Sequence, residues 1–577
     1  MPNYPARPLH RIDYTALSEA QITRALQATA NGPANTSPLS GALSGQSMRI
    51  VTDEGPTLAY DFASANRLSL SEDGAGAAEA GYGAMELGHL LFVTHMLPGT
   101  QRGFNLIIDR DTNLVTVFEV WFSGFDALNS EQPWFEPGQY NREVQRQVWF
   151  GYVDAGGAAP EARHRRTNRV EGQGFYWKQD AGMETLDFYS STFYTNFVEL
   201  SRTGGEMGFC APADYVWIDD ETFVYSRTEC EFSGTFTLYV YKPAASQQVG
   251  VRLGFDETDT LEYRLFRGEG EWLGQIARFE AFHDYDGAEM PEGKGARRVY
   301  RPMNTFQTLT AAEVDRVAAE DTHVFEPSAM AGNQQPSTGA LAGKTMTMRW
   351  DNGRTVEYRF DGAEQLSWRP AGERGWRTEK YKAWEPSPNV FMFGHLMSGA
   401  PDHDAQIMVV DLDEGLATLL HGWVGSEYIA NESQVKSVFG VVEMDGLTPP
   451  KYRRHRYTDE MLGRAITWEY SPGLTSMHLY STPYSLSWII PGANGSMGMQ
   501  WSGPSEYVKI RDGLYLAYWL EEACNGTLGT LLVNLKTMHD CGIGLHCGPN
   551  GLSLSPVGAI ARHAGRFDLA KYFPNET

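Results

Sequence analysis

Two glutamates at equivalent places in a repeated strand pattern carry the clearest chemical potential in this sequence. Glu521 lies in the stretch 506–529, EYVKIRDGLYLAYWLEEACNGTLG, and Glu229 lies in the stretch 214–237, DYVWIDDETFVYSRTECEFSGTFT, at an offset of 292 positions (521 − 229). Polar and apolar residues alternate in both, which predicts a β-strand with each glutamate on an aromatic-rich face. If that face lines an enclosed interior, burial raises the pKa of the carboxyl toward neutrality, as a general acid or base requires. The alternative is a solvated face on which each glutamate merely ends a strand.

Two histidines recur in the same manner. His95 in THMLPG and His395 in GHLMSG each end an apolar run before a turn, and Tyr82 and Tyr381 stand at matching places in the preceding strands. A histidine in such a setting could carry protons near pH 7, so both histidines are candidate catalytic residues and both tyrosines are candidate substrate contacts. A histidine on an apolar face is more often a satisfied core residue, and that alternative stays open.

Aromatic residues in the last quarter of the chain would suit a flat ligand. They are Tyr470, Tyr480, Tyr484, Trp488 and Trp519. Tyr470 is also a candidate catalytic residue, and at least half of the set is expected to be core. Arg227, two residues before Glu229, would either bind a substrate carboxylate inside the fold or form a weak salt bridge at its rim. The rim position is favoured.

These candidates lie in a sequence that contains an internal tandem repeat. Between 167–189 and 458–480 the match is gapless at an offset of 291 positions (480 − 189), and Trp177 and Trp468 are identical in it. Two tandem copies of about 290 residues therefore meet in a connector near 291–304, which is rich in Gly, Pro and Arg.

A weaker similarity inside each copy favours four units of alternating strands over two larger sandwich-like domains. The expected units are 1–160, 161–300, 301–450 and 451–577. Capping boxes predict short helices at 17–26 and 309–319, and 556–572 is expected to form a terminal helix on the fourth unit. The remaining elements are expected to be strands, so the predicted fold class is all-β with a few short helices.

Composition limits the class of protein. The chain has 577 residues, of which 12% are aromatic, with 60 Gly and 29 Pro, as expected for a turn-rich globular protein. A formal charge of −25 disfavours binding to nucleic acid or to an anionic membrane, since both require positive patches. Five cysteines do not form a disulfide framework, and the sequence has neither a signal-peptide core nor an apolar run of about 18 residues. We expect a cytoplasmic protein, with a homodimer left open.

The sequence motifs that mark common cofactors are missing. No P-loop, dinucleotide fingerprint or Gly-x-Ser-x-Gly elbow occurs in a strand-to-helix context. Cys541, His546 and Cys547 have suitable ligand atoms but no fourth ligand at ordinary zinc spacing. We therefore expect chemistry without a cofactor or a metal.

Longer segments resemble a known family. GRTVEYRF, KYKAWE, VFMFGHL and VVDL, between Gly353 and Leu412, and the segments from Tyr480 to Leu535 are similar to the N- and C-terminal domains of the MoaF family. The resemblance covers most of 300–555. It implies tandem calycin-like, lipocalin-type antiparallel β-barrels, each able to enclose one small ligand. The family's name invokes molybdenum cofactor biosynthesis, but the chain lacks the Gly-rich helix start or basic cluster that a pterin phosphate would want.

The last unit also resembles the phenolic acid decarboxylases, single-barrel enzymes that work without cofactors. The resemblance implies a catalytic glutamate in a Trp-x-Glu strand, here Trp519 and Glu521, and a tyrosine at Tyr470. The arginine of those enzymes is not reproduced, because Met499 takes its place, as Phe209 does in the second unit. That departure weakens the case for a decarboxylase and leaves the barrel intact.

We therefore expect a cofactor-free lyase, isomerase or cyclase that acts on a small apolar or aromatic metabolite. The proton-transferring residues would be Glu521, Glu229, His395, His95 and Tyr470. The alternative is a non-catalytic, lipocalin-type protein that binds or carries a small molecule. A desolvated acid or base within about 3 Å of a second polar group would separate the two, because a carrier needs only an apolar pocket.

Overall fold

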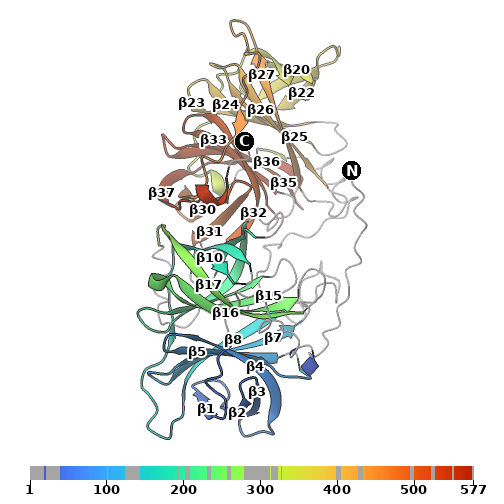
Figure 1. The fold of residues 1–577 in the computed structure, drawn as a ribbon. Coiled ribbons are helices and arrows are strands. Elements are labelled where there is room, and N and C mark those ends of the chain that lie inside the picture. Colours follow the sequence, from blue (N-terminus) through green and yellow to red (C-terminus); the bar gives the residue numbers. More distant parts are fainter. Residues whose placement is uncertain are drawn as a thin grey trace. The chain divides into compact units, whose positions relative to one another are not determined.

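The computed structural model of the chain describes residues 18–20, 22, 39–100, 102–123, 143–180, 182–191, 194–201, 208–229, 235–255, 261–278, 312, 323–325, 328–397, 404–425, 433–493, 500–521, 527–548 and 551–574. Strands dominate these residues and form four largely antiparallel sheets that follow one another along the chain (Figure 1). The predicted all-β, tandem-barrel fold is confirmed.

The first barrel closes on itself, with β8 paired to β1. Its strands are β1 (Ser47–Thr52), β2 (Leu58–Ser64), β3 (Arg67–Glu72), β4 (Ala78–Leu87), β5 (Leu90–Met96), β6 (Arg102–Asp109), β7 (Leu114–Ser123) and β8 (Glu143–Val153). In β2, buried Leu58, Tyr60 and Phe62 alternate with exposed residues. Hydrophobic burial thus sets which face of the strand lines the barrel.

The second barrel closes through the pairing of β12 with β13. Its strands are β9 (Arg165–Arg166), β10 (Gln173–Gln179), β11 (Glu184–Phe188), β12 (Tyr194–Glu199), β13 (Gly208–Trp217), β14 (Phe223–Glu229), β15 (Thr235–Lys242), β16 (Gln247–Phe255) and β17 (Leu261–Gln275). The short helix η1 (Pro243–Ala245) joins β15 to β16.

The third barrel follows the order of the first, except that its fourth strand is broken. Its strands are β19 (Thr345–Trp350), β20 (Thr355–Phe360), β21 (Gln365–Pro370), β22 (Arg377–Lys380), β23 (Lys382–Ser387), β24 (Val390–Leu396), β25 (Ala405–Asp411), β26 (Leu416–Val424) and β27 (Ser433–Glu443). β22 and β23 stand at the two ends of the sheet order, with only Tyr381 between them in sequence. The two pieces therefore lie where the continuous β4 lies in the first barrel.

The fourth barrel closes where β35 meets β37, at the pair His539 and Ile560. Its strands are β28 (Arg456–Tyr457), β29 (Arg464–Ser471), β30 (Leu474–Thr482), β31 (Ser485–Ala493), β32 (Gln500–Arg511), β33 (Leu514–Glu521), β34 (Thr527–Asn534), β35 (His539–Gly548), β36 (Gly551–Val557) and β37 (Ile560–Arg566). β18 (His323–Val324) pairs with β36, and η3 (Ala329–Ala331) precedes the third barrel in the chain.

The terminal helix expected at 556–572 is wrong. This stretch forms the end of β36, then β37, and only the short helix η4 (Ala570–Tyr572). β37 pairs along β29, which would otherwise present an open edge of unpaired backbone groups. Barrel closure therefore outweighs the local helix propensity of an alanine-containing segment. Of the helices predicted at 17–26 and 309–319, residues 19, 20, 22 and 312 are helical and Ser18 is not, and the rest lies outside the described residues.

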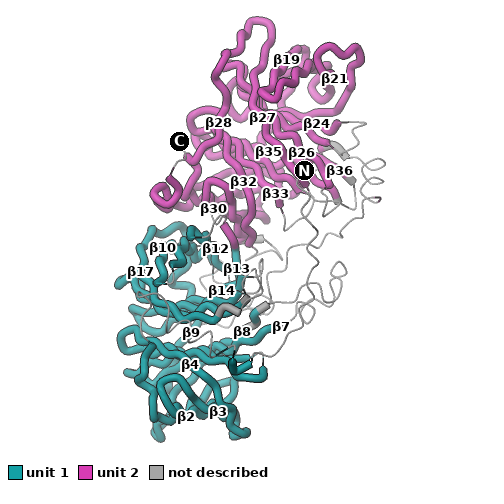
Figure 2. The backbone as a smooth tube through the Cα atoms, turned by 45° about the vertical axis from the view of Figure 1, so that its right-hand side comes forward, with its two compact units in different colours: residues 1–205, 210–300 teal, residues 206–209, 301–577 magenta. Residues whose placement is uncertain are grey.

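The chain divides into two compact units, residues 1–205 with 210–300 and residues 206–209 with 301–577 (Figure 2). Within each unit, two barrels pack through apolar outer faces. In the second unit this interface includes Val390, Met392 and Ile407 of the third barrel and Leu516, Leu532 and Ile543 of the fourth. Arg511 adds a bidentate ion pair to Asp411, at 2.6 and 2.7 Å, which fixes the same two barrels.

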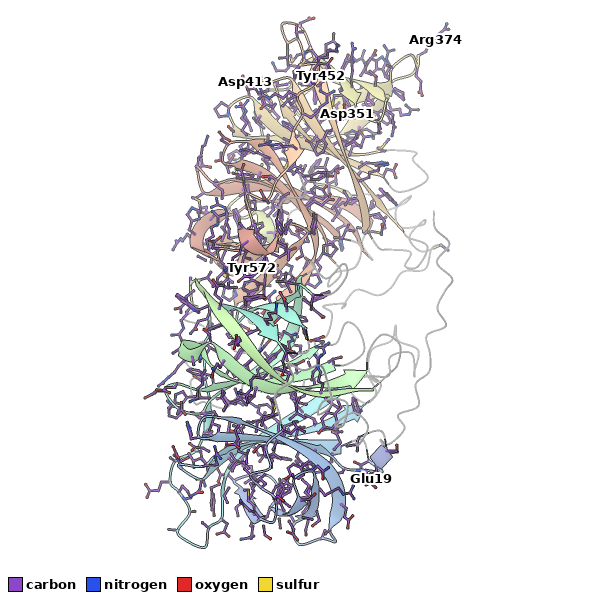
Figure 3. The ribbon with its side chains drawn as sticks, in the orientation of Figure 1. Glu19, Asp351, Arg374, Asp413, Tyr452 and Tyr572 are labelled. Atoms are coloured by element: carbon purple, nitrogen blue, oxygen red, sulfur yellow. The ribbon has the colours of Figure 1, made fainter. Side chains whose placement is uncertain are left out.

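Three of the barrels also have a hydrophobic cluster on their inward faces, separate from these interfaces. The first and third barrels enclose separate apolar cores, which include Tyr60 and Phe104 in one and Tyr358 and Phe393 in the other. Tyr452, labelled in Figure 3, is 82% exposed and belongs to neither core. Among the described residues no helix is long and apolar enough to cross a membrane.

Candidate active site

β33 presents Glu521 to the interior of the fourth barrel. Leu516 and Tyr518 belong to the interface with the third barrel, so the alternating residues Trp519 and Glu521 point the opposite way, into their own barrel. Glu229 does the same in the second barrel, where Val224 lies in the barrel–barrel interface. Both glutamates therefore lie on the inward faces of their strands, Glu229 fully buried and Glu521 partly exposed at the end of β33.

Two tryptophans hold the carboxylate of Glu521. Trp488 Nε1 and Trp519 Nε1 donate hydrogen bonds to Oε2 of Glu521, at 2.9 and 3.1 Å. The ring of Trp501 lies 6.3 Å from that of Trp488, between centroids. Glu521 is partly exposed, whereas both tryptophans that bind it are buried. One region of the barrel therefore combines a carboxylate with a wall of indoles.

Asp540 is the second inward carboxyl of this barrel. Its neighbours Cys541 and Ile543 belong to the barrel–barrel interface, so Asp540 points inward from β35. Oδ1 accepts a hydrogen bond from the Ala559 amide at 2.6 Å, and Oδ2 has no hydrogen-bond partner among the described residues. Burial raises the pKa of Asp540 to about 8, although the Ala559 amide opposes that shift. Asp540 is thus a carboxyl that exchanges its proton near neutral pH.

Tyr470 lies within electrostatic reach of both carboxyls. Burial raises the pKa of its phenol far above the usual value, and the charges of Asp540 and Glu521 raise it further. The Tyr470 hydroxyl lies 3.4 Å from Nε2 of His478. Burial lowers the pKa of His478 to about 3, so its imidazole is neutral at physiological pH. Tyr480 is fully buried beside them and feels the same Asp540 charge.

The internal repeat shows what changed between the second and fourth barrels. At offsets of 291 (478 − 187) and 292 (521 − 229), the equivalent inward positions are Asp187 and His478, Arg227 and Trp519, Glu229 and Glu521, Gln248 and Asp540, and Arg252 and Gly544. At three further equivalent positions the fourth barrel has smaller residues than the second. Tyr225, Tyr239 and Tyr241 of the second barrel correspond to Ala517, Leu531 and Val533 of the fourth. Only the glutamate is common to both sets of polar groups.

An ionic network lies inside the second barrel. Arg252 binds Glu229 through two nitrogens, at 2.8 and 3.2 Å, and Arg227 Nε adds a third contact to Glu229 at 3.0 Å. Arg227 also pairs with Asp187, to which Thr185 donates a hydrogen bond at 2.9 Å. All the groups are buried, which makes this an internal network of balanced charge.

This network corrects two expectations. The favoured rim position of Arg227 is wrong, because its side chain is fully buried between Asp187 and Glu229. The expected rise in the pKa of Glu229 is also wrong. Burial does raise it, but the Arg252 and Arg227 guanidiniums outweigh burial and bring the pKa of Glu229 to about 2. Glu229 is therefore held as a permanent anion, which suits a structural ion pair better than acid catalysis.

The two predicted histidines lie in the apolar cores of the first and third barrels. His95 Nε2 lies 3.0 Å from the hydroxyl of Tyr60, and His395 Nδ1 lies 3.1 Å from the Leu396 carbonyl oxygen. Burial lowers the pKa of His95 to about 3 and that of His395 to about 4. Both imidazoles stay neutral at pH 7, so these environments do not support proton transfer by a titrating histidine there.

Tyr82 and Tyr381 occupy equivalent buried positions. The Tyr82 hydroxyl donates to the Ser64 carbonyl at 3.0 Å, and the Tyr381 hydroxyl donates to the Gly362 carbonyl at 2.9 Å. These hydrogen bonds tie each phenol to a hairpin of its own barrel. The structure thus brings Tyr82 near His95 across β4 and β5, but it places neither tyrosine with Glu521.

Tyr484 does not line the fourth barrel. It lies in the turn between Thr482 and Ser485, which joins β30 to β31, and it is 48% exposed. Strand alternation predicts which of the neighbouring residues point inward. It does not apply to Tyr484, because a turn residue belongs to neither face of a strand. Met499, named as the replacement of an arginine, lies outside the described residues.

His478 and Asp540 were missed by the reasoning from sequence. The strand around Asp540, HDCGIGLHCG, is interrupted by glycines and shows no clear apolar alternation. The usable signal was the repeat itself, since Asp540 replaces Gln248 and His478 replaces Asp187. A change from an uncharged to an ionisable residue between two copies points to a change of role.

Metal ligands do not converge in the part of the chain that the structure describes. No group of three or more His, Cys, Asp or Glu residues there could hold a metal ion. Cys541 and Cys547 lie in the barrel–barrel interface, while His546 alternates to the other face of β35 and approaches Thr527. The three residues therefore cannot bind one ion together.

Two parts of the chain match known protein domains. Residues 328–425 match the MoaF N-terminal domain, and residues 455–566 match the MoaF C-terminal domain. No curated protein matches the chain. A solved structure from Burkholderia vietnamiensis, described as a candidate beta-lactamase, shares 13% identity over 19% of this chain and 99% of its own, with a TM-score of 0.15. A likeness of that size supports no statement about fold or activity.

Proposed function

The chain belongs to the MoaF family through residues 328–425 and 455–566, and on that premise we propose that its fourth barrel is a cofactor-independent enzyme. The proposed reaction moves a proton on a small apolar or aromatic metabolite, as a lyase, isomerase or cyclase does. The polar residues that would carry it are Asp540, Tyr470, His478 and Glu521.

Asp540 is the observation that carries this proposal. A fully buried carboxyl with a pKa of about 8 is costly to keep for structure alone, because its ionised form is desolvated. Its Oδ2 atom has no hydrogen-bond partner among the described residues, and a polar substrate atom would satisfy it. Perturbed carboxyls of this kind cluster at active sites, where their pKa matches the working pH.

The groups around Asp540 suit a proton transfer that needs no external reagent. Asp540 would give its proton to one atom of the substrate, and a base in the same barrel would remove a proton from another atom. Tyr470 and His478, which lie 3.4 Å apart, would orient the substrate as neutral hydrogen-bonding groups, because burial keeps the imidazole unprotonated. Glu521, held by the indole N–H groups of Trp488 and Trp519, would bind or deprotonate the substrate at a second position. No oxidant or reductant is needed. In an isomerisation an electron pair shifts between bonds of the substrate as the proton moves, and in a lyase or cyclase reaction the two proton transfers accompany the bond that breaks or forms within the substrate.

Smaller side chains favour the fourth barrel over the second as the place for a ligand. Ala517, Leu531 and Val533 stand where the second barrel has three tyrosines, and Gly544 stands where it has Arg252. The second barrel already fills its interior with tyrosine rings and paired charges. The proposal therefore assigns the two barrels different roles, although both contain the repeated glutamate.

A carrier protein is the second candidate. The observation in its favour is that the first and third barrels enclose apolar, aromatic cores with neutral histidines, which is the lining of an apolar binding site rather than of a reactive one. A carrier would bind a metabolite without exchanging its protons. Exchange measured in heavy water separates the two candidates directly.

The test uses the full chain in deuterium oxide with a panel of aromatic acids, amines and terpenoids. We expect deuterium to enter at carbon in at least one compound, as followed by mass spectrometry and proton NMR. Asp540→Asn keeps the shape of the protonated acid and removes its proton, so it should slow this exchange by about a hundredfold or more. Glu521→Gln should slow it as well.

The matched control is Gln248→Asn, at the equivalent position of the second barrel. It should leave the exchange rate unchanged. Exchange that survives in Asp540→Asn at the wild-type rate, in a variant whose circular dichroism is native, would overturn the assignment of the site. Binding without exchange across the whole panel would favour the carrier.

A further inference from the structure

We propose that the second barrel binds a small, uncharged ligand between the side-chain amides of Gln179 and Gln248. The ligand would carry an N–H and a C=O group side by side, as a primary amide or a lactam does. It would be bound and not converted, because a glutamine amide does not ionise. The inference concerns a different barrel from the proposed reaction and does not depend on that reaction.

Strand register brings the two glutamines into one row on the inward face. Gln179 of β10 pairs with Gly268 of β17, and Gly268 pairs in turn with Gln248 of β16. Trp177, two residues before Gln179, and Tyr241, opposite Gln248 on β15, belong to the cluster inside this barrel. Both glutamines therefore point inward as well, with one glycine between them in the row.

The glycine leaves room for the Gln248 amide. A Cβ added at Gly268 would lie 2.6 Å from Nε2 and 2.9 Å from Cγ of Gln248. The side chain of Gln248 therefore extends over Gly268 toward β10. Because the Cβ positions of paired residues are about 5 Å apart, this direction brings the Gln248 amide beside Gln179.

Neither side-chain amide has a hydrogen-bond partner among the described residues. Gln248 is fully buried and Gln179 is 2% exposed, and Oε1 and Nε2 of both side chains are unpaired. Exchanging the oxygen and nitrogen of either amide would not alter this, because both atoms are unpaired. Buried polar groups in folded proteins are almost always hydrogen-bonded, so this row presents donors and acceptors for a ligand.

The chemistry of the row favours an uncharged ligand with an amide edge. A glutamine amide has an acceptor and a donor on neighbouring atoms, and a group with N–H beside C=O complements both. A charged ligand would find no free counter-charge, because Arg227 and Arg252 pair with Asp187 and Glu229. Its desolvation would therefore go uncompensated.

The rest of the interior limits the size of the ligand. Tyr239, Gly250 and Phe266 form the next inward row toward the ionic network. The rings of Trp177 and Tyr241 lie beside the glutamines, 6.0 Å apart between centroids. Rings thus flank the amides, and we expect a small flat group rather than the larger metabolite proposed for the fourth barrel.

The repeat uses the same two positions in the fourth barrel. Gln179 and Gln248 correspond to Tyr470 (470 − 179 = 291) and Asp540 (540 − 248 = 292). The Asp540 charge raises the pKa of Tyr470, as expected for two side chains that lie near each other. Both copies therefore place a pair of polar side chains at these inward positions, and in the second barrel neither member of the pair can exchange a proton with a ligand.

The experiment compares 2-pyrrolidone with γ-butyrolactone, which has the same shape and carbonyl group but a ring oxygen in place of the N–H. Ligand-observed NMR titrations on the full chain give the two dissociation constants. We expect 2-pyrrolidone to bind more tightly by about tenfold or more, because the lactone leaves a glutamine oxygen unpaired.

Substitutions of the glutamines test the site itself. Gln248→Leu and Gln179→Leu each remove an amide that the fold leaves unpaired, so each should fold and weaken binding of 2-pyrrolidone by about tenfold or more. Gly268→Ala should weaken it too, because the added methyl would displace the Gln248 amide. Gln406→Leu is the control, since Gln406 is buried in the third barrel and bound by the Tyr358 hydroxyl at 2.5 Å. It should leave the affinity unchanged.

Three results would overturn the inference: no binding of 2-pyrrolidone, equal affinity for the two probes, or wild-type affinity in both leucine variants. Far-UV circular dichroism verifies the fold of each variant, and Gly268→Ala decides should both leucine variants fail to fold. Deuterium exchange reports on the fourth barrel and lactam binding on the second, so either result can fail while the other stands.

Discussion

Glu229 and Glu521 occupy the same position in a repeat, and their neighbours give them opposite properties. Two guanidiniums surround Glu229 and hold its pKa near 2, whereas two indole N–H groups bind one oxygen of Glu521. The strand alternation put each side chain on one face with aromatic neighbours, which could be predicted from sequence, whereas the structure was needed to show that this face points inward. The partners come from strands that are distant in sequence, and the alternation of one strand carries no information about them.

Asp540 makes the stability of the protein depend on pH. In the unfolded chain its carboxyl ionises near the ordinary pKa of 3.8, and in the folded chain burial moves that pKa to about 8. Between these values the folded state holds one more proton than the unfolded state, so the free energy of unfolding falls as pH rises and levels off above about pH 8. The fall approaches about 1.4 kcal/mol per pH unit. Tyr470, Tyr480 and Cys541 are the ionisable groups that feel this charge.

Asp540→Asn should remove this dependence. The variant should match the wild type near pH 4 and exceed its stability increasingly up to about pH 8, because the amide cannot ionise. Denaturant unfolding between pH 5 and about pH 9, followed by tryptophan fluorescence, measures the difference. Parallel stability curves for the two proteins would show that Asp540 ionises normally in the fold.

At the scale of the strand, the repeat was more informative than local propensity. The paired tracts at offsets of 291 and 292 predicted which strands correspond, and the structure pairs β14 with β15 and β33 with β34 in the same way. The helix predicted at 556–572 was wrong because helix propensity is a local property of the segment. In the fold, β37 pairs with the edge of β29, a strand that is distant in sequence. Closure is a property of the whole sheet, and it decides the structure of the last segment.

The ionic network ties three strands of the second barrel. Asp187 comes from β11, Arg227 and Glu229 come from β14, and Arg252 comes from β16. Arg252→Met should lower the free energy of unfolding by about 3 kcal/mol, because it leaves a buried carboxylate with one guanidinium fewer. Arg349→Met is the matched control, since the Arg349–Glu443 pair is exposed, and it should change stability little. An equal loss in the free energy of unfolding for the two variants would show that the buried network stabilises the protein no more than an exposed ion pair does.

At the scale of the molecule, the working fold is the pair of barrels rather than the single barrel. Each unit contains two interiors and one apolar interface between outer strand faces. The two-fold repeat of the sequence predicted the copies. The pairing within each copy was not predicted, because a strand that is apolar on both faces looks the same in sequence whichever partner covers it.

Two truncated proteins taken from the second unit should differ in folding and in association. A protein of residues 301–577 keeps the interface and should be a soluble, cooperatively folding species. A protein of residues 451–577 exposes Leu516, Leu532 and Ile543 on one face and should aggregate or associate. Size-exclusion chromatography and near-UV circular dichroism compare them. A monomeric, native-like 451–577 would show that a single barrel is sufficient.

The small residue at Gly544 has a consequence for how such a protein can change over generations. Glycine and arginine codons differ by a single base, so one mutation could give the fourth barrel the side chain that closes the second. In a duplicated gene, such a substitution can change the interior of one barrel without changing the strands that enclose it. Arg252 of the second barrel and Gly544 of the fourth are such a pair, so a single substitution separates the two side chains at this position of the repeat.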